Sequence, residues 1–402
     1  MKNSVYGILL IMIFTVACSS NKISKEDFDI DKMLDYAVKK AEITMNSLKT
    51  TDSLPRNIEN NQTNWNKVDI YDWTSGFWPG ILWYAYEKSG DSLILENARI
   101  FSEVLKGVLD VPVYNHDLGF MFYCSLGNGL RLTGDKQYHE ILMAAADSLA
   151  TLYNPKVGTI LSWPQMREKM NWPHNTIIDN MMNLELLFWA AKNSDRHNLY
   201  DIAVKHAETT MRTLVRPDFT TYHVAIFDTI DGHFIKGVTH QGFSDSSMWA
   251  RGQGWGIYGF TMTYRETGDE KFLTTACRLA DVFIEQLPED GIPYWDFDDP
   301  AIPNAPKDVS AAAIAASGML ELSTFMKEEK QKIKYRNAAI GLLKRISSDK
   351  YLSMQKNKAM LMHSTGNYPN GSEIDASIIY ADYYYVEALL RLGQHYSEIS
   401  NN

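Results

Sequence analysis

The sequence predicts an all-α protein, an (α/α)6 barrel built from six helical hairpins, with six inner helices inside six outer ones. Three observations support this: helical hydrophobic periodicity runs through most of the chain, amphipathic stretches alternate with stretches that are apolar nearly all round, and short turns join them in pairs. Six hairpins of roughly 45–75 residues close most economically into a ring. The alternative is an open superhelix of helical hairpins, although its repeats are usually shorter and more even in length.

The outer helices are predicted where one helical face is apolar and the opposite face carries Lys and Glu. In one such stretch, apolar side chains from Tyr138 to Leu149 recur at spacings of three and four residues. The six stretches of this kind lie at about 30–48, 91–108, 138–149, 197–215, 270–287 and 329–349.

The inner helices are predicted from stretches rich in Ala, Gly, Met and aromatic residues. A helix that is apolar nearly all round is buried, so these stretches belong at the centre of the barrel. They lie at about 76–88, 117–132, 179–193, 253–266, 308–326 and 374–393. We expect no β-strands, because the chain has no convincing run of alternating apolar and polar residues.

The two kinds of connection differ in length, and this predicts where a functional site lies. The short turns read KSGD at 88–91, LTGD at 132–135 and ETGD at 266–269, where Gly suits a left-handed helix end and Asp caps the next helix. The opposite connections are long, at about 49–75, 154–178, 216–252, 288–307 and 350–372. Long loops in a compact domain are usually functional, so we expect the site at the N-terminal ends of the inner helices.

These long loops are rich in side chains that bind sugars or anions. Exposed Trp rings stack on sugars, and helix N-termini favour an anionic ligand. The loop residues of this kind are Trp65, Trp73, Trp163, Trp172, Trp249, Trp295, His174, His223, His233, His240, His363 and Arg251.

Residues 1–18, MKNSVYGILLIMIFTVAC, combine Lys2 with a short apolar run that ends at Cys18. The run is too short to span a bilayer as a permanent helix and resembles a bacterial lipoprotein signal, in which Cys18 carries the lipid. Thr15 departs from the usual Leu, and a plain secretory signal is the alternative. We expect a polar tether at 19–29, a catalytic domain at 30–396, and a lipid-anchored protein of the bacterial cell envelope, on the periplasmic face of the outer membrane because no acidic run follows Cys18.

The composition excludes several classes of function. The net charge of −10 argues against general nucleic-acid binding. The chain has no HExxH and no Cys pair at zinc spacing, so we expect no metal site. It also has no Gly-rich phosphate loop after a strand and no GxSxG nucleophile elbow. Cys124 and Cys277 fall in apolar helical stretches and are interpreted as core thiols.

Asp117 and Asp179 occupy the same position in two copies of one pattern. Each begins a mostly apolar stretch and lies about 16 residues before a polar turn, so the two carboxylates come out on the same face of a helical array. The alternative is that each Asp only caps its helix. Close carboxylates raise the pKa of one member, and the apolar surroundings of Asp179 favour its protonated form.

Two further clusters lie at the starts of predicted inner helices. Residues 240–260, HQGFSDSSMWARGQGWGIYGF, contain an Arg that can grip a carboxylate and Trp rings that can face a sugar, although a structural salt bridge is the alternative. Residues 75–91 contain Trp78 in the segment WPG, which could also be a helix start with Pro79 in its first turn.

Taken in order, these blocks resemble the unsaturated glucuronyl hydrolases of glycoside hydrolase family 88. The resemblance covers most of residues 30–395 and is carried by GFWPGILWYAYEKSGD, HDLGF, IIDNMMNLELLFWA, the region of His223, and HQGF followed by WARGQGWGIYGF. It implies an (α/α)6 barrel, no metal or organic cofactor, and an unsaturated oligosaccharide as substrate.

The resemblance also implies a mechanism and a set of site residues. Asp179 would donate a proton to C4 of a C4=C5 double bond in a terminal uronic acid and help water to add at C5, while Asp117 supports it. The implied substrate-binding residues are Trp78, His116, His223, His240, Gln241, Trp249, Arg251, Trp255 and Ser364. The residues after Ser364 read Thr365-Gly366-Asn367-Tyr368 and lack the lysine that some relatives use for sulfate.

Three alternatives remain open from the sequence. A related barrel enzyme acts on unsaturated rhamnogalacturonan fragments of pectin. A glycan-binding lipoprotein without catalysis would have no need of two carboxylates in register. A sugar epimerase on the same barrel would need a His pair as its acid and base.

Overall fold

The computed structural model describes residues 28–401, with side chains as far as residue 395, and it confirms the closed barrel. Each inner helix packs against the next, and the last inner helix, α13 (Ile379–Asn401), packs against the first, α2 (Phe77–Ser89). This contact excludes the open superhelix. The predicted signal peptide, Cys18 and most of the predicted tether lie outside the described residues.

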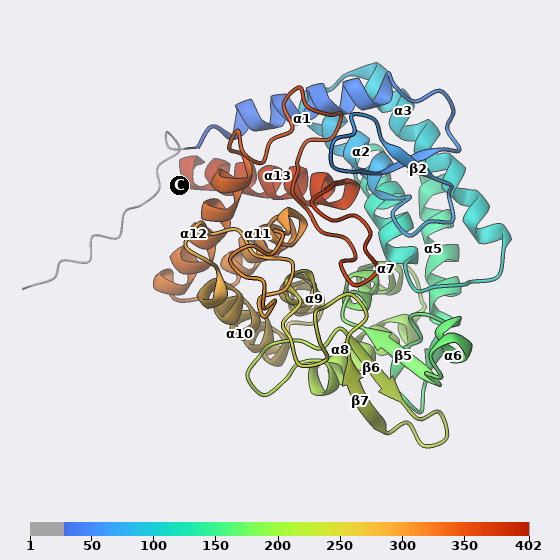
Figure 1. Ribbon diagram of the computed structural model, residues 1–402. Helices are drawn as coiled ribbons and strands as arrows, with labels where there is room; N and C mark the ends of the chain where they lie inside the picture. The colour runs from blue at the N-terminus through green and yellow to red at the C-terminus, as the bar shows by residue number, and fades with distance from the viewer. Residues whose placement is uncertain (1–27, 402) are drawn as a thin grey trace, which may run out of the picture.

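The twelve barrel helices lie within a few residues of the predicted ranges (Figure 1). The other inner helices are η3 (Gly119–Gly127) continued by α4 (Asn128–Thr133), α7 (Asn180–Lys192), α9 (Ala250–Thr267) and α11 (Val309–Thr324). The outer helices are α1 (Ile30–Met45), α3 (Ser92–Glu103), α5 (Lys136–Ala150), α8 (His197–Thr213), α10 (Glu270–Gln286) and α12 (Glu329–Ile346). A 3-10 segment, η2 (Val104–Asp110), extends α3, and α6 (Met166–Lys169) is a single turn within a long loop.

The predicted turn chemistry is confirmed at all three Gly-Asp turns. Gly90, Gly134 and Gly268 end their inner helices in the left-handed region, with φ of 67°, 68° and 68°. The Asp that follows each glycine accepts a hydrogen bond from the first backbone N–H groups of the next outer helix. Local sequence therefore sets one end of the barrel.

The second inner helix differs from the prediction, because η3 is a π-helix over nine residues rather than an α-helix. It packs closely on α7: a Cβ added to Gly119 would lie 2.5 Å from Cα of Asn183. Only glycine permits this approach. The contact joins the start of η3, two residues after Asp117, to helix α7, which begins immediately after Asp179.

The expectation of no β-strands is wrong, because the long loops form three small sheets. Their strand orders are β2-β1-β8, β3-β4 and β5-β6-β7, all antiparallel. All four residues of β5 and of β6 are buried, so these strands lack the alternation that would have revealed them. The bounds are β1 (Leu54–Ile58), β2 (Asn66–Val68), β3 (Tyr153–Asn154), β4 (Thr159–Ile160), β5 (His174–Ile177), β6 (Val224–Phe227), β7 (Phe234–Val238) and β8 (Ser377–Ile378).

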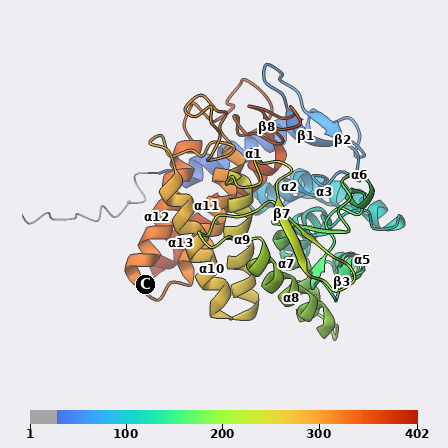
Figure 2. The same ribbon diagram turned by 60° about the horizontal axis from the view of Figure 1, so that its bottom comes forward.

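The loops and sheets gather at one end of the barrel. In Figure 2, β1, β2 and β8 lie at the end of the molecule opposite the C-terminal end of α13. Within the described part of the chain, none of the helices combines the length and the apolar character that crossing a membrane requires.

Candidate active site

The β5-β6-β7 sheet brings Asp179 and His223 together. Strand β5 ends just before Asp179, β6 begins just after His223, and the pairing of the two strands lets the backbone N–H of Ile178 donate to the His223 carbonyl at 3.0 Å. As a result, Nε2 of His223 lies 3.9 Å from Oδ1 of Asp179. Strand β7 adds the next two residues, since the backbone N–H groups of His240 and Gln241 each donate to Nδ1 of His223 at 3.1 Å.

Asp117 has a matching histidine on the opposite side of the site. Nε2 of His116 lies 3.4 Å from Oδ1 of Asp117, and Nδ1 of His116 is 3.3 Å from the side-chain amide of Asn183. The backbone N–H of Phe120 donates to Oδ1 of the same Asn183, so its Nδ2 is the group that donates to the histidine.

Both histidines are neutral and turn an N–H toward a carboxylate. Burial lowers the pKa of His116 to about 3 and the pKa of His223 well below its ordinary value. In each ring Nδ1 accepts hydrogen bonds, so the proton of the neutral ring lies on Nε2, the atom nearest the aspartate. The site therefore contains two histidine–aspartate pairs, and the histidine of each pair is neutral.

Neither aspartate serves as a helix cap. Asp179 stands at the N-cap position of α7, but its side chain makes no capping hydrogen bond with a described residue. Its Oδ1 is buried without a hydrogen-bond partner among the described residues. The N-terminus of η3, which follows Asp117, has no side-chain cap either. The cap alternative is thereby rejected, since an Asp retained for capping would bind the exposed backbone N–H groups.

Burial raises the pKa of both carboxyl groups. The pKa of Asp179 is raised to about 7, although the nearby charge of Arg251 lowers it in part. The pKa of Asp117 is raised well above its ordinary value by burial, and the charges of Asp179 and Asp72 raise it further. The sequence predicted a raised pKa for Asp179, whereas in the structure the pKa values of both aspartates are raised. At least one of the two carboxyl groups therefore keeps its proton near neutral pH.

The site offers buried polar atoms to a polar ligand. Six side-chain atoms there are buried and have no hydrogen-bond partner among the described residues, whereas buried polar groups in proteins are nearly always paired. They are His116 Nε2, Asp179 Oδ1, Asn180 Oδ1, His223 Nε2, Trp249 Nε1 and Ser364 Oγ. Donors and acceptors together suit a ligand with many hydroxyl groups.

Arg251 is bonded to other residues of the protein, in addition to the substrate contact that the sequence predicts for it. Its Nη1 donates to Oδ2 of Asp308 and to the Thr365 carbonyl, both at 2.6 Å, and its side chain is only 3% exposed. The guanidinium also lies 4.5 Å from the centre of the Trp249 ring. Arg251 thus anchors the loop that carries Ser364, and its contact with a substrate carboxylate stays a prediction.

The comparisons with known proteins decide the family. The model of the family described as Glycosyl Hydrolase Family 88 matches residues 46–395 of the chain. The chain belongs to glycoside hydrolase family 88. It is therefore a glycoside hydrolase.

Individual relatives agree with this assignment. An unsaturated glucuronyl hydrolase of Formosa agariphila is 40% identical over 400 residues, covering 97% of this chain and 98% of the relative. An unsaturated chondroitin disaccharide hydrolase of Streptococcus pyogenes serotype M1 is 34% identical, covering 92% and 94%. The crystal structure of an unsaturated glucuronyl hydrolase specific for heparin aligns with a TM-score of 0.86 at 42% identity, covering 92% of this chain and 98% of that one.

Two predicted tryptophans of this family 88 enzyme do not face the substrate. Trp78 is 1% exposed and packs edge-on against Phe101 of outer helix α3, so it lies on the outward face of α2. Trp255 is fully buried against Phe120 and Tyr384, at ring distances of 5.2 and 5.3 Å, in the barrel interior. Both residues are corrected to structural roles.

Trp73, unlike Trp78, keeps part of its ring exposed next to the start of α2. It precedes α2, is only partly buried, and its ring lies 5.2 Å from Tyr380 and 5.5 Å from Phe120. The sequence placed Trp73 in a long loop, but α2 is apolar nearly all round, so the pattern could not show which Trp faces inward.

The two tryptophans give opposite expectations for alanine variants. Trp73→Ala should raise KM at nearly unchanged stability. Trp78→Ala should lower the free energy of unfolding by about 3–5 kcal/mol, as expected for a buried aromatic residue, and leave KM unchanged in the folded fraction. Steady-state kinetics and urea unfolding of the two variants separate these effects, and a raised KM for Trp78→Ala with normal stability would contradict the correction.

Trp163 is a site residue to which the sequence assigned no role. Its ring lies edge-on to three histidine rings, at 6.5 Å from His116, 5.7 Å from His223 and 5.3 Å from His240. Its place among the loop tryptophans was the available signal. Asn183 was missed as well, because the sequence gives no sign that an inner helix would orient His116.

The remaining loop histidines do not join the site. His174 bonds the Thr159 hydroxyl within the small sheets, and His233 is exposed beside Asp231 at the β6-β7 turn. Asp228, Asp231 and His233 lie close enough together to hold a cation, but they are exposed or half-buried at the far end of β6 from His223. His240, Trp249 and Gln241 lie beside His223, and Ser364 lies on the loop that Arg251 anchors; their contacts with a substrate stay predictions.

The pKa of Asp179 predicts an alkaline limit to activity. A general acid must be protonated, and the protonated fraction is complete below the pKa and lost as the pH rises through it, here about 7. We expect kcat/KM to fall with increasing pH above about 7, while the fold stays intact by circular dichroism. A profile that stays flat to about pH 9 would exclude Asp179 as the proton donor.

Proposed function

We propose that this family 88 enzyme hydrates the C4=C5 double bond of an unsaturated uronic acid at the non-reducing end, and thereby releases it from lyase-generated oligosaccharides of the glycosaminoglycan type. The observation that carries this is the pair of buried carboxyl groups with raised pKa values, each beside a neutral histidine N–H. Such a pair can deliver a proton to carbon at neutral pH, which hydration of a vinyl ether requires.

The proposed steps conserve atoms and charge. The proton of Asp179 forms a C4–H bond with the π electrons of the double bond, and the ring oxygen stabilises the positive charge at C5. The oxygen of one water molecule then bonds to C5, and its proton returns to the Asp179 carboxylate. The resulting hemiketal opens and the glycosidic bond breaks, so one water is consumed for each uronic acid released.

The neutral histidines argue against the epimerase alternative. An acid–base His pair must titrate near the working pH, whereas burial lowers the pKa of His116 to about 3 and the pKa of His223 well below its ordinary value. The two buried carboxyl groups with raised pKa values likewise argue against a purely sugar-binding protein, because such groups are not required to hold a neutral sugar.

The loop after Ser364 bears on the second sugar. Tyr368 stacks on Trp295 at 4.4 Å between ring centres, and the loop from Ser364 to Tyr368 contains no lysine or arginine. We propose that unsulfated disaccharides are preferred over those with a sulfated second sugar, because sulfate binds best to a nearby cation.

A single assay tests the proposal. Unsaturated disaccharides from hyaluronan, chondroitin with and without sulfate, heparin and pectin are incubated with the enzyme, and the ultraviolet absorbance of the conjugated double bond is followed. We expect loss of absorbance with glycosaminoglycan fragments and least with the pectin fragment. No loss with any substrate would overturn the proposal, and loss with the pectin fragment alone would favour the rhamnogalacturonyl hydrolase.

We also propose that the mature protein is lipid-anchored through Cys18 at the periplasmic face of the outer membrane. The support is the apolar run, the cysteine and the polar segment after it. Expression with a labelled fatty acid in a Gram-negative host should label the wild-type chain and not Cys18→Ala. Equal labelling of both chains, or digestion of the protein by protease added to intact cells, would contradict the anchor or its side.

A further inference from the structure

A cavity of about 460 Å³ extends along the barrel axis away from the catalytic mouth, toward the ends of the inner helices that carry the short turns. Its walls come from five of the six inner positions: α2, η3 with α4, α7, α9 and α13. None of the residues assigned to the substrate lines it. The volume lies within the range of about 300–1,000 Å³ typical of small-molecule sites, and it is far larger than a metal ion needs.

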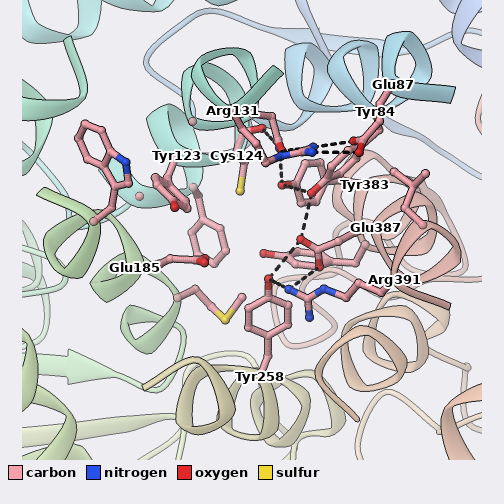
Figure 3. Close-up of a pocket in the computed structure, with 18 of the residues that line it drawn as sticks. Tyr84, Glu87, Tyr123, Cys124, Arg131, Glu185, Tyr258, Tyr383, Glu387 and Arg391 are labelled. Atoms are coloured by element: carbon pink, nitrogen blue, oxygen red, sulfur yellow. Dashed lines mark hydrogen bonds and ion pairs between the residues drawn. The ribbon is translucent and has the colours of Figure 1, made fainter. Parts of the chain in front are cut away.

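Aromatic rings form much of the cavity wall (Figure 3). The hydroxyls of Tyr84 and Tyr258 donate to Oε1 of Glu387 at 3.0 and 3.2 Å, so these hydrogen bonds fix the carboxylate in place at the wall. The aromatic residues that line the cavity are Tyr84, Phe120, Tyr123, Trp189, Tyr258, Tyr383 and Tyr384.

Carboxylates outnumber cations in the ion-pair network that reaches the cavity wall through Glu185, Glu387 and Arg391 and continues behind it. Arg265 pairs with Glu185, Glu266 and Glu321, and Arg391 pairs with Glu321 at 3.0 Å and lies 3.8 Å from Glu387. The network thus holds four carboxylates against two guanidinium groups, a formal excess of two negative charges, and none of these six side chains is more than 30% exposed. Arg131 adds no net charge, since it pairs with Glu87.

The unusual backbone of η3 belongs to this cavity. The cavity is lined by residues of η3 and by the first residue of α4, which recur about every four positions along one side: Gly119, Phe120, Tyr123, Cys124, Gly127 and Asn128. π-helical turns are rare and often mark functional sites. Here the same π-helix begins next to Asp117 at one end and forms the cavity wall along its length.

We propose that this cavity binds a small organic cation, an ammonium compound of about the size of choline. Aromatic faces attract a cation, and a partly buried excess of carboxylate is relieved by one. The same charge excess disfavours anionic sugars, so the ligand differs in chemistry from the substrate of the catalytic mouth. The inference rests on the cavity alone and is independent of the proposed reaction.

Isothermal titration of the folded enzyme with choline and with 3,3-dimethylbutan-1-ol tests the charge requirement. The two probes have nearly the same shape, and only choline carries a positive charge. We expect choline to bind at least tenfold more tightly, a difference of about 1.4 kcal/mol. Equal affinities, or no binding of choline to the folded protein, would overturn the proposal.

Variants locate the site. Glu185→Gln removes one wall carboxylate and should weaken choline binding about tenfold. Glu208→Gln removes a carboxylate of outer helix α8 that pairs with Lys271 of α10, and should leave choline binding unchanged. If Glu185→Gln does not fold, Tyr123→Leu replaces it and removes one aromatic wall. Unchanged binding in the folded wall variant, or displacement of choline by an unsaturated disaccharide, would place the cation elsewhere and overturn the proposal.

Discussion

Asp179→Asn is expected to abolish turnover while the unsaturated sugar still binds. The amide has nearly the shape of the carboxyl group but cannot donate an acidic proton, so kcat should fall by at least about 10²–10⁴, the usual contribution of a positioned general acid. Substrate affinity, measured by titration calorimetry, should stay within a few-fold of that of the wild type. Full activity in this variant would remove Asp179 from its assigned role.

Asp382 provides a matched control for this experiment. It is also a buried carboxyl group whose pKa is raised to about 7, but it accepts the backbone N–H groups of Met360 and Leu361, away from the catalytic pair. Asp382→Asn should reduce stability and leave kcat of the folded fraction nearly unchanged. Equal loss of kcat in both variants would show that any buried carboxyl matters, and would contradict a specific role for Asp179.

Asp179→Asn should also stabilise the protein at higher pH. Burial raises the pKa of Asp179 from 3.8 to about 7, so the folded state binds this proton more tightly than the unfolded state does. The group therefore favours folding less and less as the pH rises from about 4 to about 7, and the penalty persists above that. Asp179→Asn lacks this penalty, and its Tm should exceed that of the wild type most clearly above pH 7.

Arg251→Ala should be the most damaging change to the fold of the site. It leaves the carboxylate of Asp308 and the carbonyls of Thr365 and Gly366 buried without their cation. Removing one partner of a buried ion pair typically costs about 3–5 kcal/mol in the free energy of unfolding. KM should rise as well, because the loop that carries Ser364 loses its anchor.

Arg196→Ala is the matched control, because Arg196 pairs with Asp147 at 3.1 Å on the surface and is 43% exposed. Exposed pairs contribute about 0–1 kcal/mol, so this variant should keep nearly full stability and an unchanged KM. Arg251→Lys separates charge from geometry, since a lysine cannot bond the carboxylate and both carbonyls in one plane. Wild-type stability and KM in Arg251→Ala would refute the anchoring role.

The barrel could be predicted because its signals are local. Helical periodicity needs only neighbouring residues, and the Gly-Asp turns at 90–91, 134–135 and 268–269 specify where one helix ends and the next begins. The register of Asp117 and Asp179 followed from repetition of one pattern, and the structure places both in one site.

The rest depends on contacts between residues far apart in the sequence. Strands β5 and β6 are separated by helices α7 and α8, are only four residues long and are fully buried, yet their pairing sets His223 beside Asp179. The inward face of α2 could not be read from a helix that is apolar all round, and therefore Trp78 was chosen over Trp73. The many bonds of Arg251 come from loops at 308 and 365–366 that no local pattern connects to it.

The contact between α2 and α13 has a consequence for how the chain is made. The ring closes only when the last helix arrives, so a ribosome-bound or truncated chain lacking α13 leaves the packing faces of α2 and α11 open to solvent. Such a chain has unpacked apolar surface at both ends of the array and is prone to aggregate. Productive folding therefore waits for the C-terminus, and closure of the ring is the slow, long-range step that we expect to limit its rate.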